Sequence, residues 1–335
     1  MPDRRRFFKE LLREAASVAQ EVSSALRPEE EPEEEWRPPP PVAARPATER
    51  VDVEELLELS REAGLEARAE DVRRLARVGI RLTPAPAEGD QVGRTRLGGL
   101  PDLPRGVEWP ARDGRELAFV GQVNLAHVAA VNPEAPLPRE GLLLFFYDLG
   151  RRPRGVDPAD RGSCRVLYAD DLSELEPHES RAPHLRALPV ELSRELQLPG
   201  AWSLHGEALE LTYDESTAWD ELRERLAAAQ GVELDDTSPD RVALHRLLGY
   251  HEEFGREVEI DCELAATGVD ADDDSTYYDQ RVDHEAQARE WRLLLQLSAD
   301  ESLGTPRDEF DRLYICIRDE DLRAGRFDGA WAIRR

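Results

Sequence analysis

The chain has 335 residues, 40% of them hydrophobic, so it can bury the core of one large domain or of two ordinary ones. Its 71 acidic residues outnumber 44 basic ones, giving a formal net charge of -27. This balance argues against nucleic-acid binding, which needs clustered Lys and Arg, and suits solubility or a basic protein partner.

Residues 1–27 are predicted to form an amphipathic helix, because apolar residues recur at spacings of three and four between positions 5 and 26. Glutamates on its polar face disfavour membrane association and favour docking on its own domain or on a partner. The "DRRRFFK" stretch is not a twin-arginine export signal, since charged residues interrupt the apolar segment that such a signal needs after its arginines. Residues 28–50 are rich in Glu and Pro, which predicts a disordered linker.

The three cysteines, Cys164, Cys262 and Cys316, form no C-x-x-C pair. That pattern argues for a reducing compartment and against a disulfide framework. Metal-ligand spacing is absent as well, so we predict no metal and no cofactor. With no run of 18 apolar residues, the sequence indicates a cytoplasmic protein.

Residues 51–79 are predicted to be a helical lead-in. Asp52 is a suitable N-cap for a helix that ends near Gly64, and a second helix is expected over 69–78, ending at Gly79. The main domain is expected to span residues 80–335, beginning with a strand at Ile80.

Within this domain the apolar patterns predict both strands and helices. Strands are expected over 116–125, 141–149, 164–170, 188–192, 209–213, 291–297 and 312–317. Helices are expected over 216–229, from Ser238 to Leu248, and over 319–323. The fold class predicted is α+β, a single domain with internally duplicated mixed β-sheet units.

The duplication is suggested by a weak repeat. A Gly98–Gly99 turn precedes a strand containing Gln122, and a turn at Leu248–Gly249 precedes a strand containing Gln296. In each half a very apolar strand ending in Asp comes next.

Several motifs carry a resemblance to a known family. "RTRLGGLPDLPRGVEWP", "LAFVGQVNLA", "LPREGLLLFFYD", "HRLLGY", "WRLLLQL" and "RLYICIRDEDLRAGRFDGAW" resemble successive motifs of the YwqG-like family, a bacterial domain family of uncharacterised function. The resemblance covers residues 80–335 and implies a single, usually cytosolic α+β domain with internal duplication, no assigned catalytic residues and no known cofactor. The chain departs from the family pattern at 249–256 and 305–312, which puts any shared ligand site at those turns in doubt.

The candidate binding residues are those around the two glutamine strands: Gly98, Gly99, Pro101, Trp109, Gln122 and Gln296. A buried amide must find partners or cost about 1–3 kcal/mol, so the simpler interpretation is that each glutamine bonds the adjoining turn. The functional interpretation is that both amides line a cleft between the halves, near Trp109.

Other chemistry finds less support. Asp270, Asp272 and Asp274 match the first ligands of a calcium loop, but Ser275 and Arg281 replace its required Gly and Glu. Cys262 with His245 or His251 could form a nucleophile and base, yet nothing local activates the thiol, and His245 is expected on a helix surface. Phosphate loops, nucleophile elbows and dinucleotide fingerprints are absent, so no catalytic residue is predicted.

Two functions stay open. The first is a non-enzymatic cytoplasmic module that binds or regulates another protein, for instance by neutralising a toxin. The alternative is an enzyme or small-ligand binder that uses the cleft between the halves, with acids such as Asp148 or Asp300 nearby. The oligomeric state is left open by the sequence.

Overall fold

The computed structural model describes residues 51–86, 92–178, 182–232, 244–251, 255–305 and 312–335. The chain divides into two units, Met1–Pro46 and Ala47–Arg335, and all described residues belong to the second. The predicted helix over 1–27 and most of the linker over 28–50 therefore lie in the first unit, and both lie outside the described residues.

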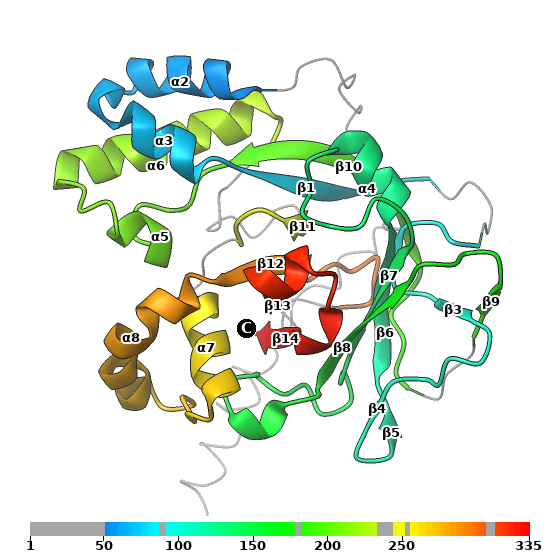
Figure 1. Cartoon of the computed structure of the whole chain (residues 1–335). Helices are drawn as coiled ribbons and strands as arrows, with labels where there is room; N and C mark the ends of the chain where they lie inside the picture. The colour runs from blue at the N-terminus through cyan, green and yellow to red at the C-terminus, as the bar shows by residue number, and fades with distance from the viewer. Residues whose placement is uncertain (1–50, 87–91, 179–181, 233–243, 252–254, 306–311) are drawn as a thin grey trace, which may run out of the picture. The chain divides into compact units, whose positions relative to one another are not determined.

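The centre of the second unit is a large antiparallel sheet (Figure 1). In the described part of the chain its strand order is β14-β13-β12-β11-β1-β10-β2-β6-β7-β8. The strands are β1 (Arg77–Pro84), β2 (Arg96–Leu97), β6 (Ala118–Asn124), β7 (Leu142–Tyr147), β8 (Cys164–Ala169), β10 (Leu188–Gln197), β11 (His245–Leu248), β12 (Trp291–Ser298), β13 (Arg312–Arg318) and β14 (Trp331–Arg334). Two small sheets pair β3 (Asp102–Pro104) with β9 (Leu175–Pro177) and β4 (Ala111–Arg112) with β5 (Arg115–Glu116).

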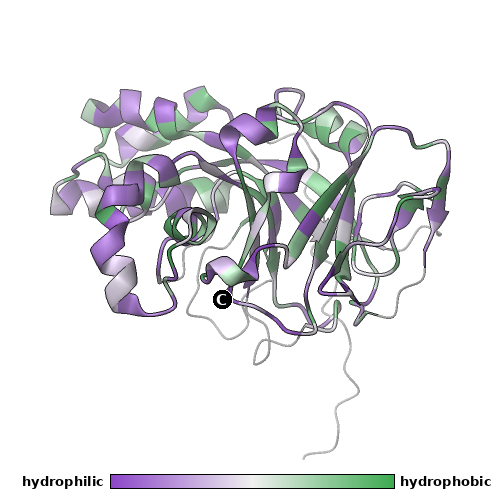
Figure 2. Cartoon of the chain, turned by 60° about the horizontal axis from the view of Figure 1, so that its bottom comes forward, coloured by the Kyte–Doolittle hydropathy of each residue, from purple (hydrophilic) through white to green (hydrophobic). Residues whose placement is uncertain are grey.

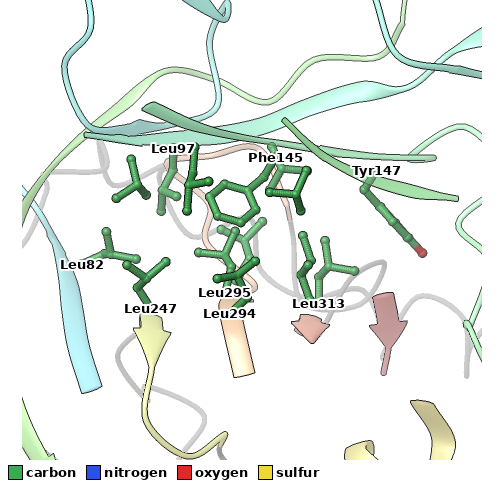
Figure 3. Close-up of a cluster of buried hydrophobic side chains, with 14 of the residues drawn as sticks. Leu82, Leu97, Phe145, Tyr147, Leu247, Leu294, Leu295 and Leu313 are labelled. Carbon is green, nitrogen blue, oxygen red and sulfur yellow. The ribbon is translucent and has the colours of Figure 1, made fainter. Parts of the chain in front are cut away.

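The sheet curls until it is nearly closed. The loop between β7 and β8 meets the last strand, where Gly155 O accepts a hydrogen bond from Trp331 Nε1 at 2.7 Å and Arg154 O accepts one from the Arg334 amide at 3.0 Å. Inside the curl, apolar side chains of the first-half strands face those of the second half, as Leu97 and Phe145 face Leu247 and Leu295 in Figure 3. One core therefore joins both ends of the sheet.

Helices cover the sheet from both halves of the sequence. They are α2 (Val53–Glu62), α3 (Ala69–Leu75), α4 (Leu125–Val131), α5 (Leu204–Glu207), α6 (Tyr213–Ala229), α7 (Val258–Thr267), α8 (Asp274–Ala288) and α9 (Asp319–Arg323), with 3-10 turns at Glu66–Arg68, Pro158–Asp160 and Phe327–Gly329. Their colours alternate between hydrophilic and hydrophobic in Figure 2, as expected of helices buried on one face. No helix among the described residues has the length and apolar character needed to cross a membrane.

A separate core lies where α2, α3 and α6 pack together with the end of β10. Trp219 of α6 is completely buried there, and its Nε1 donates to Pro199 O at 2.8 Å. The lead-in helices are thus part of the same unit as the sheet.

The predicted mixture of helices and strands is confirmed, and several elements occur where the pattern placed them. Asp52 caps α2 by accepting hydrogen bonds from the amides of Glu54 and Glu55, and α9 spans the predicted residues. The sheet itself is antiparallel in every described pairing, so the expectation of a mixed sheet was wrong.

Three local predictions were also wrong. The helix expected over 69–78 ends at Leu75, because residues from Arg77 onward pair with β10. The strand expected over 209–213 is absent because a capping box of Thr212 and Glu215 starts α6 there. His245–Leu248, expected to end a helix, is strand β11 between β1 and β12, and all four residues are buried; Ser238 and Pro239 lie outside the described residues.

Candidate functional site

The first group of predicted site residues gathers around the end of β2. Gln122 on β6 is completely buried; its Oε1 accepts from the Asp102 amide at 2.9 Å, and its Nε2 donates to Arg94 O at 2.8 Å. Gly98 and Gly99 follow β2, and Pro101 immediately precedes Asp102. These contacts match the interpretation in which the glutamine holds the adjoining turn.

The other predicted residues lie elsewhere. Gln296 on β12 is separated from Gln122 by strands β11, β1, β10 and β2 within the sheet, and its Nε2 donates to Leu244 O at 3.0 Å. Trp109 packs edge to face against Phe146 at 5.5 Å and donates to Leu117 O. The cleft containing all six residues stays a prediction.

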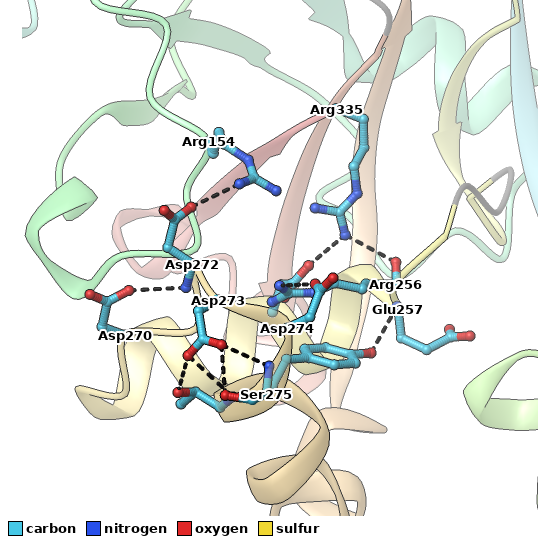
Figure 4. A network of polar contacts seen from close by, with 12 residues as sticks. Arg154, Arg256, Glu257, Asp270, Asp272, Asp273, Asp274, Ser275 and Arg335 are labelled. Carbon is cyan, nitrogen blue, oxygen red and sulfur yellow. Dashed lines mark hydrogen bonds and ion pairs between the residues drawn. The ribbon is translucent and has the colours of Figure 1, made fainter.

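The acidic stretch around Asp272 consists of separate local contacts (Figure 4). Asp273 caps α8 by accepting from the amides of Ser275 and Thr276, Asp272 pairs with Arg154 at 2.8 Å, and Asp274 pairs with Arg256 at 3.3 Å. Each of these carboxylates therefore has its own partner within the described residues.

The thiols offer no activated nucleophile. Cys262 on α7 is buried beside Cys316 of β13, and burial followed by this neighbour raises the Cys262 pKa well above its usual value. His245 is also buried, in β11 rather than on a helix surface, and its Nε2 lies 3.1 Å from Asp300. A protonated thiol is a poor nucleophile, so covalent catalysis by Cys262 finds no support.

The best-formed hollow with convergent charges is a cavity of about 260 Å³, called here the Arg77 cavity. Its polar lining comes from β1, the segment after α4, β12 and α9: Arg77, Asn132, Glu134, Arg292, Asp319 and Arg323. A hollow of about 460 Å³ borders it and shares Pro136 and Arg323, but Arg323 is the only charged side chain among its described lining residues.

Two of the three arginines in the Arg77 cavity pair with the same carboxylate. Asp319, the first residue of α9, accepts from Arg292 Nε at 2.9 Å and from Arg323 Nε at 2.7 Å. Burial alone would raise the Asp319 pKa, but bonds from these two arginines outweigh it and lower the pKa. Asp319 is therefore a carboxylate that holds both guanidinium groups in place.

Arg77 is different, because no described carboxylate lies within ion-pair distance of it. Its guanidinium lies over the Tyr250 ring, 4.2 Å from the centroid, and burial lowers its pKa. Glu259 and Asp319 attract this cation only from beyond ion-pair distance, so this wall of the cavity favours a further negative charge close to the guanidinium.

The Leu248–Gly249 turn forms another wall. Both residues have left-handed backbone angles, with φ of 60° at Leu248 and 77° at Gly249. A Cβ at Gly249 would lie 2.1 Å from Gln197 Oε1 and 2.9 Å from Gly79 Cα, so only glycine fits. Leu248 has a side chain in this conformation at a cost of about 1–2 kcal/mol, and such strain is concentrated at functional sites.

Buried polar groups fix that turn from behind. Glu195 Oε1 accepts from Arg246 Nη2 at 2.9 Å and from Gln197 Nε2 at 2.8 Å, while Gln197 Oε1 accepts from the Tyr250 amide at 2.8 Å. Tyr250 OH donates to Leu75 O at 2.9 Å, and burial raises its pKa to about 12. The ring under Arg77 is therefore neutral and firmly held.

Next to Tyr250 lies a buried cluster of histidine and glutamate. The His205 ring packs edge to face on Tyr250 at 5.5 Å, and the His251 Nε2 is 2.7 Å from Glu259 Oε2. The donor atoms of His251, Glu257 and Glu259 lie within 4.8 Å of one another. Among the described residues this is the one group of three that could hold a metal ion.

Sequence patterns did not single out Arg77, Arg292 or His205. They come from a strand edge, a strand start and a four-residue helix, and only the fold brings them together. The one local signal was the "RDEDL" segment that contains Asp319.

Comparison with known proteins gives a family without an activity. The model of a family described as "Domain of unknown function (DUF1963)" matches residues 95–334. No curated protein matches the chain.

Proposed function

Since the chain belongs to the DUF1963 family of domains of unknown function, we propose its function from its own geometry: it binds a small anionic metabolite in the Arg77 cavity. The observation that carries the proposal is the Arg77 guanidinium, which lines the cavity with no carboxylate partner in the described part of the chain. A carboxylate or phosphate would supply the missing charge and match the planar donor pair of arginine.

The rest of the cavity suits such a ligand. Arg292 and Arg323 share the single carboxylate of Asp319, so the three arginines exceed the two lining acids by one charge. Asn132 adds an amide, and the volume of about 260 Å³ fits a metabolite rather than a macromolecule. The sequence analysis offered a small-ligand binder as its alternative function. The present proposal keeps that function but places the binding site at Arg77 rather than at the two glutamines.

We also propose that the two halves of the sheet are duplicates. The strand order is symmetric about β1 and β10, with β2-β6-β7-β8 on one side and β11-β12-β13-β14 on the other. Arg96 faces Gln122 as Arg246 faces Gln296, and a bulge interrupts the register two residues before each glutamine.

The turns of the two halves support the same proposal. Gly98 and Gly99 have φ of 59° and 75°, against 60° and 77° at Leu248 and Gly249. The strand registers make Leu185 the first-half counterpart of Arg77, because Leu188 faces Leu97 as Ile80 faces Leu247. Leu185 is buried in the main core. A charge at the position where the other half has a core leucine favours a binding role for Arg77.

The test is thermal unfolding in a panel of anions at constant ionic strength, with chloride as reference and phosphate, sulfate, malonate and citrate as probes. A ligand at 100 times its Kd stabilises the native state by about 2.7 kcal/mol. We expect at least one probe to raise the Tm of the wild type and of Arg115→Met, an exposed control, and to have no effect on Arg77→Met. Equal stabilisation of Arg77→Met, or no stabilisation by any probe, contradicts the proposal.

A protein partner is the second candidate. Trp202 and Tyr278 are 64% and 59% exposed. Arg281 pairs with Glu207 at 2.6 Å, which links α8, the helix of Tyr278, to α5, the helix just after Trp202. Exposed Trp and Tyr are typical of protein interfaces, and the net charge of -27 suits a basic partner in a reducing cytoplasm. Capture of the same partner by the wild type and by a Trp202→Ser, Tyr278→Ser variant would contradict this surface.

We further propose that the family is the one called YwqG-like.

A further inference from the structure

Four side chains with metal-binding atoms meet beside Tyr250, and they come from three parts of the chain. His205 belongs to α5, His251 follows β11, and Glu257 and Glu259 lie at the start of α7. All four are more than nine-tenths buried, with exposed fractions of 8%, 7%, 8% and 4%. In Figure 4 the Glu257 side chain points away from the acidic stretch around Asp272, so the two groups are distinct.

The distances between the donor atoms are close to those of a coordination shell. His251 Nε2 and Glu259 Oε2 are 2.7 Å apart, and His205 Nε2 and Glu259 Oε1 are 4.0 Å apart. Ligand atoms 2.0–2.1 Å from a tetrahedral Zn²⁺ lie roughly 3.3 Å from one another. Small rotations would bring the donor atoms of His251, Glu257 and Glu259 around one ion, and His205 Nε2 lies next to Glu259 as the fourth ligand.

His205 gives the independent reason to expect an ion. Its Nε2 is buried and has no hydrogen-bond partner among the described residues, although it faces Glu259. A neutral imidazole nitrogen is a metal ligand, whereas a buried nitrogen left without a partner costs about 1–3 kcal/mol.

The charge of the cluster also favours a bound cation. Two glutamates, Glu257 and Glu259, share this buried volume. A divalent cation would neutralise two carboxylates, and imidazole with carboxylate is a ligand set that Zn²⁺ accepts.

We propose that His205, His251, Glu257 and Glu259 form a binding site for Zn²⁺ or a similar divalent transition-metal ion. The neighbouring side chains are arranged to orient the ligands. His251 packs edge to face on Tyr314 at 5.5 Å, and the amide of Glu257 donates to Tyr277 OH at 3.0 Å. These contacts fix the His251 ring and the Glu257 backbone in place.

The experiment uses the full-length protein, free of any affinity tag and stripped with EDTA. Zn²⁺ is titrated by calorimetry and Co²⁺ by absorption spectroscopy. We expect one equivalent of each ion to bind and to raise the Tm. His184→Gln, which changes an exposed histidine outside the cluster, is expected to bind like the wild type. Glu259→Gln is expected to lose at least about tenfold in affinity.

His205→Phe provides a variant that keeps its fold, since it preserves a ring against Tyr250 and removes the nitrogen without a partner. It is also expected to lose at least about tenfold in Zn²⁺ affinity. Absence of saturable binding to the wild type, or unchanged affinity in His205→Phe, overturns the metal site. The anion titrations are repeated on stripped protein, so loss of one binding activity with retention of the other identifies which proposal fails.

Discussion

Asp102 is almost completely buried, and three donors hold its carboxylate. Oδ2 accepts from Arg96 Nη1 at 3.0 Å, from Gln122 Nε2 at 2.6 Å and from the Gly93 amide at 2.8 Å. Burial alone would raise the Asp102 pKa, but these bonds outweigh it and lower the pKa. The predicted site residue Gln122 thus acts on a carboxylate that the sequence did not single out.

Asp102→Asn tests this arrangement through pH. The folded pKa lies below the unfolded one, so the stability contributed by Asp102 is present above about pH 4 and is lost as the pH falls through the folded pKa. We expect the variant to be less stable by about 2 kcal/mol at pH 7 and to lose less stability than the wild type on acidification. Urea unfolding from pH 7 to pH 2.5 measures both.

The control is Asp170→Asn, at an exposed position. Its unfolding free energy should match that of the wild type at every pH. If the free energy of unfolding fell equally steeply with decreasing pH in Asp102→Asn and in the wild type, protonation of Asp102 would not be linked to folding.

At the scale of elements, a helix start with a capping side chain could be predicted from the sequence, whereas the ends of strands could not. Asp52 and the apolar runs of β12 and β13 have signals within their own sequence. The polar, weakly amphipathic helix α8 begins at Asp274, after its N-cap Asp273, inside a run of acids that is typical of a loop. β11 has four buried residues, too few for a period, and only its pairing with β1 and β12 makes it a strand.

The capping box of α6 is the element feature with the clearest energetic consequence. Thr212 Oγ1 accepts from the Glu215 amide, and the Glu215 carboxylate accepts from the Thr212 amide and from Arg68 at 2.7 Å. We expect Thr212→Ala to lower the free energy of unfolding by about 1 kcal/mol. The measurement is the urea midpoint, compared with that of Thr217→Ala.

Thr217 is exposed on the same helix, and its hydroxyl donates back to Tyr213 O. Its replacement by Ala should leave stability unchanged or increase it slightly, because Ala is the better helix former. Equal losses in both variants would mean that the cap contributes nothing beyond the ordinary effect of replacing an exposed threonine by Ala.

At the scale of the whole molecule, composition and strand patterns predicted an α+β body, but not where its ends meet. The Arg77 cavity needs β1, β12 and α9 side by side, and β1 lies more than two hundred residues from the other two in the chain. No local pattern reports such a contact. The glutamines were visible because they interrupt apolar strands, whereas Arg77 begins its strand beside a helix rich in charged residues and looks like an ordinary exposed arginine.

Closure of the sheet depends on contacts of the same long range, and Trp331 tests it. Its Nε1 donates to Gly155 O, which joins β14 to the loop between β7 and β8, and the Arg161 guanidinium lies 5.2 Å from its ring. Trp331→Phe keeps an aromatic ring but leaves a buried carbonyl without its donor, at a cost of about 1–3 kcal/mol. We expect Trp331→Phe to accelerate hydrogen exchange of the β14 amides relative to the wild type, and to accelerate that of the β7 amides less. Trp109→Phe removes a similar bond, to Leu117 O just before β6 rather than to the loop between β7 and β8, and should leave β14 exchange as in the wild type. If both variants accelerated exchange equally in β14 and β7, the loss would be global, and the Trp331 contact would not be what closes the sheet.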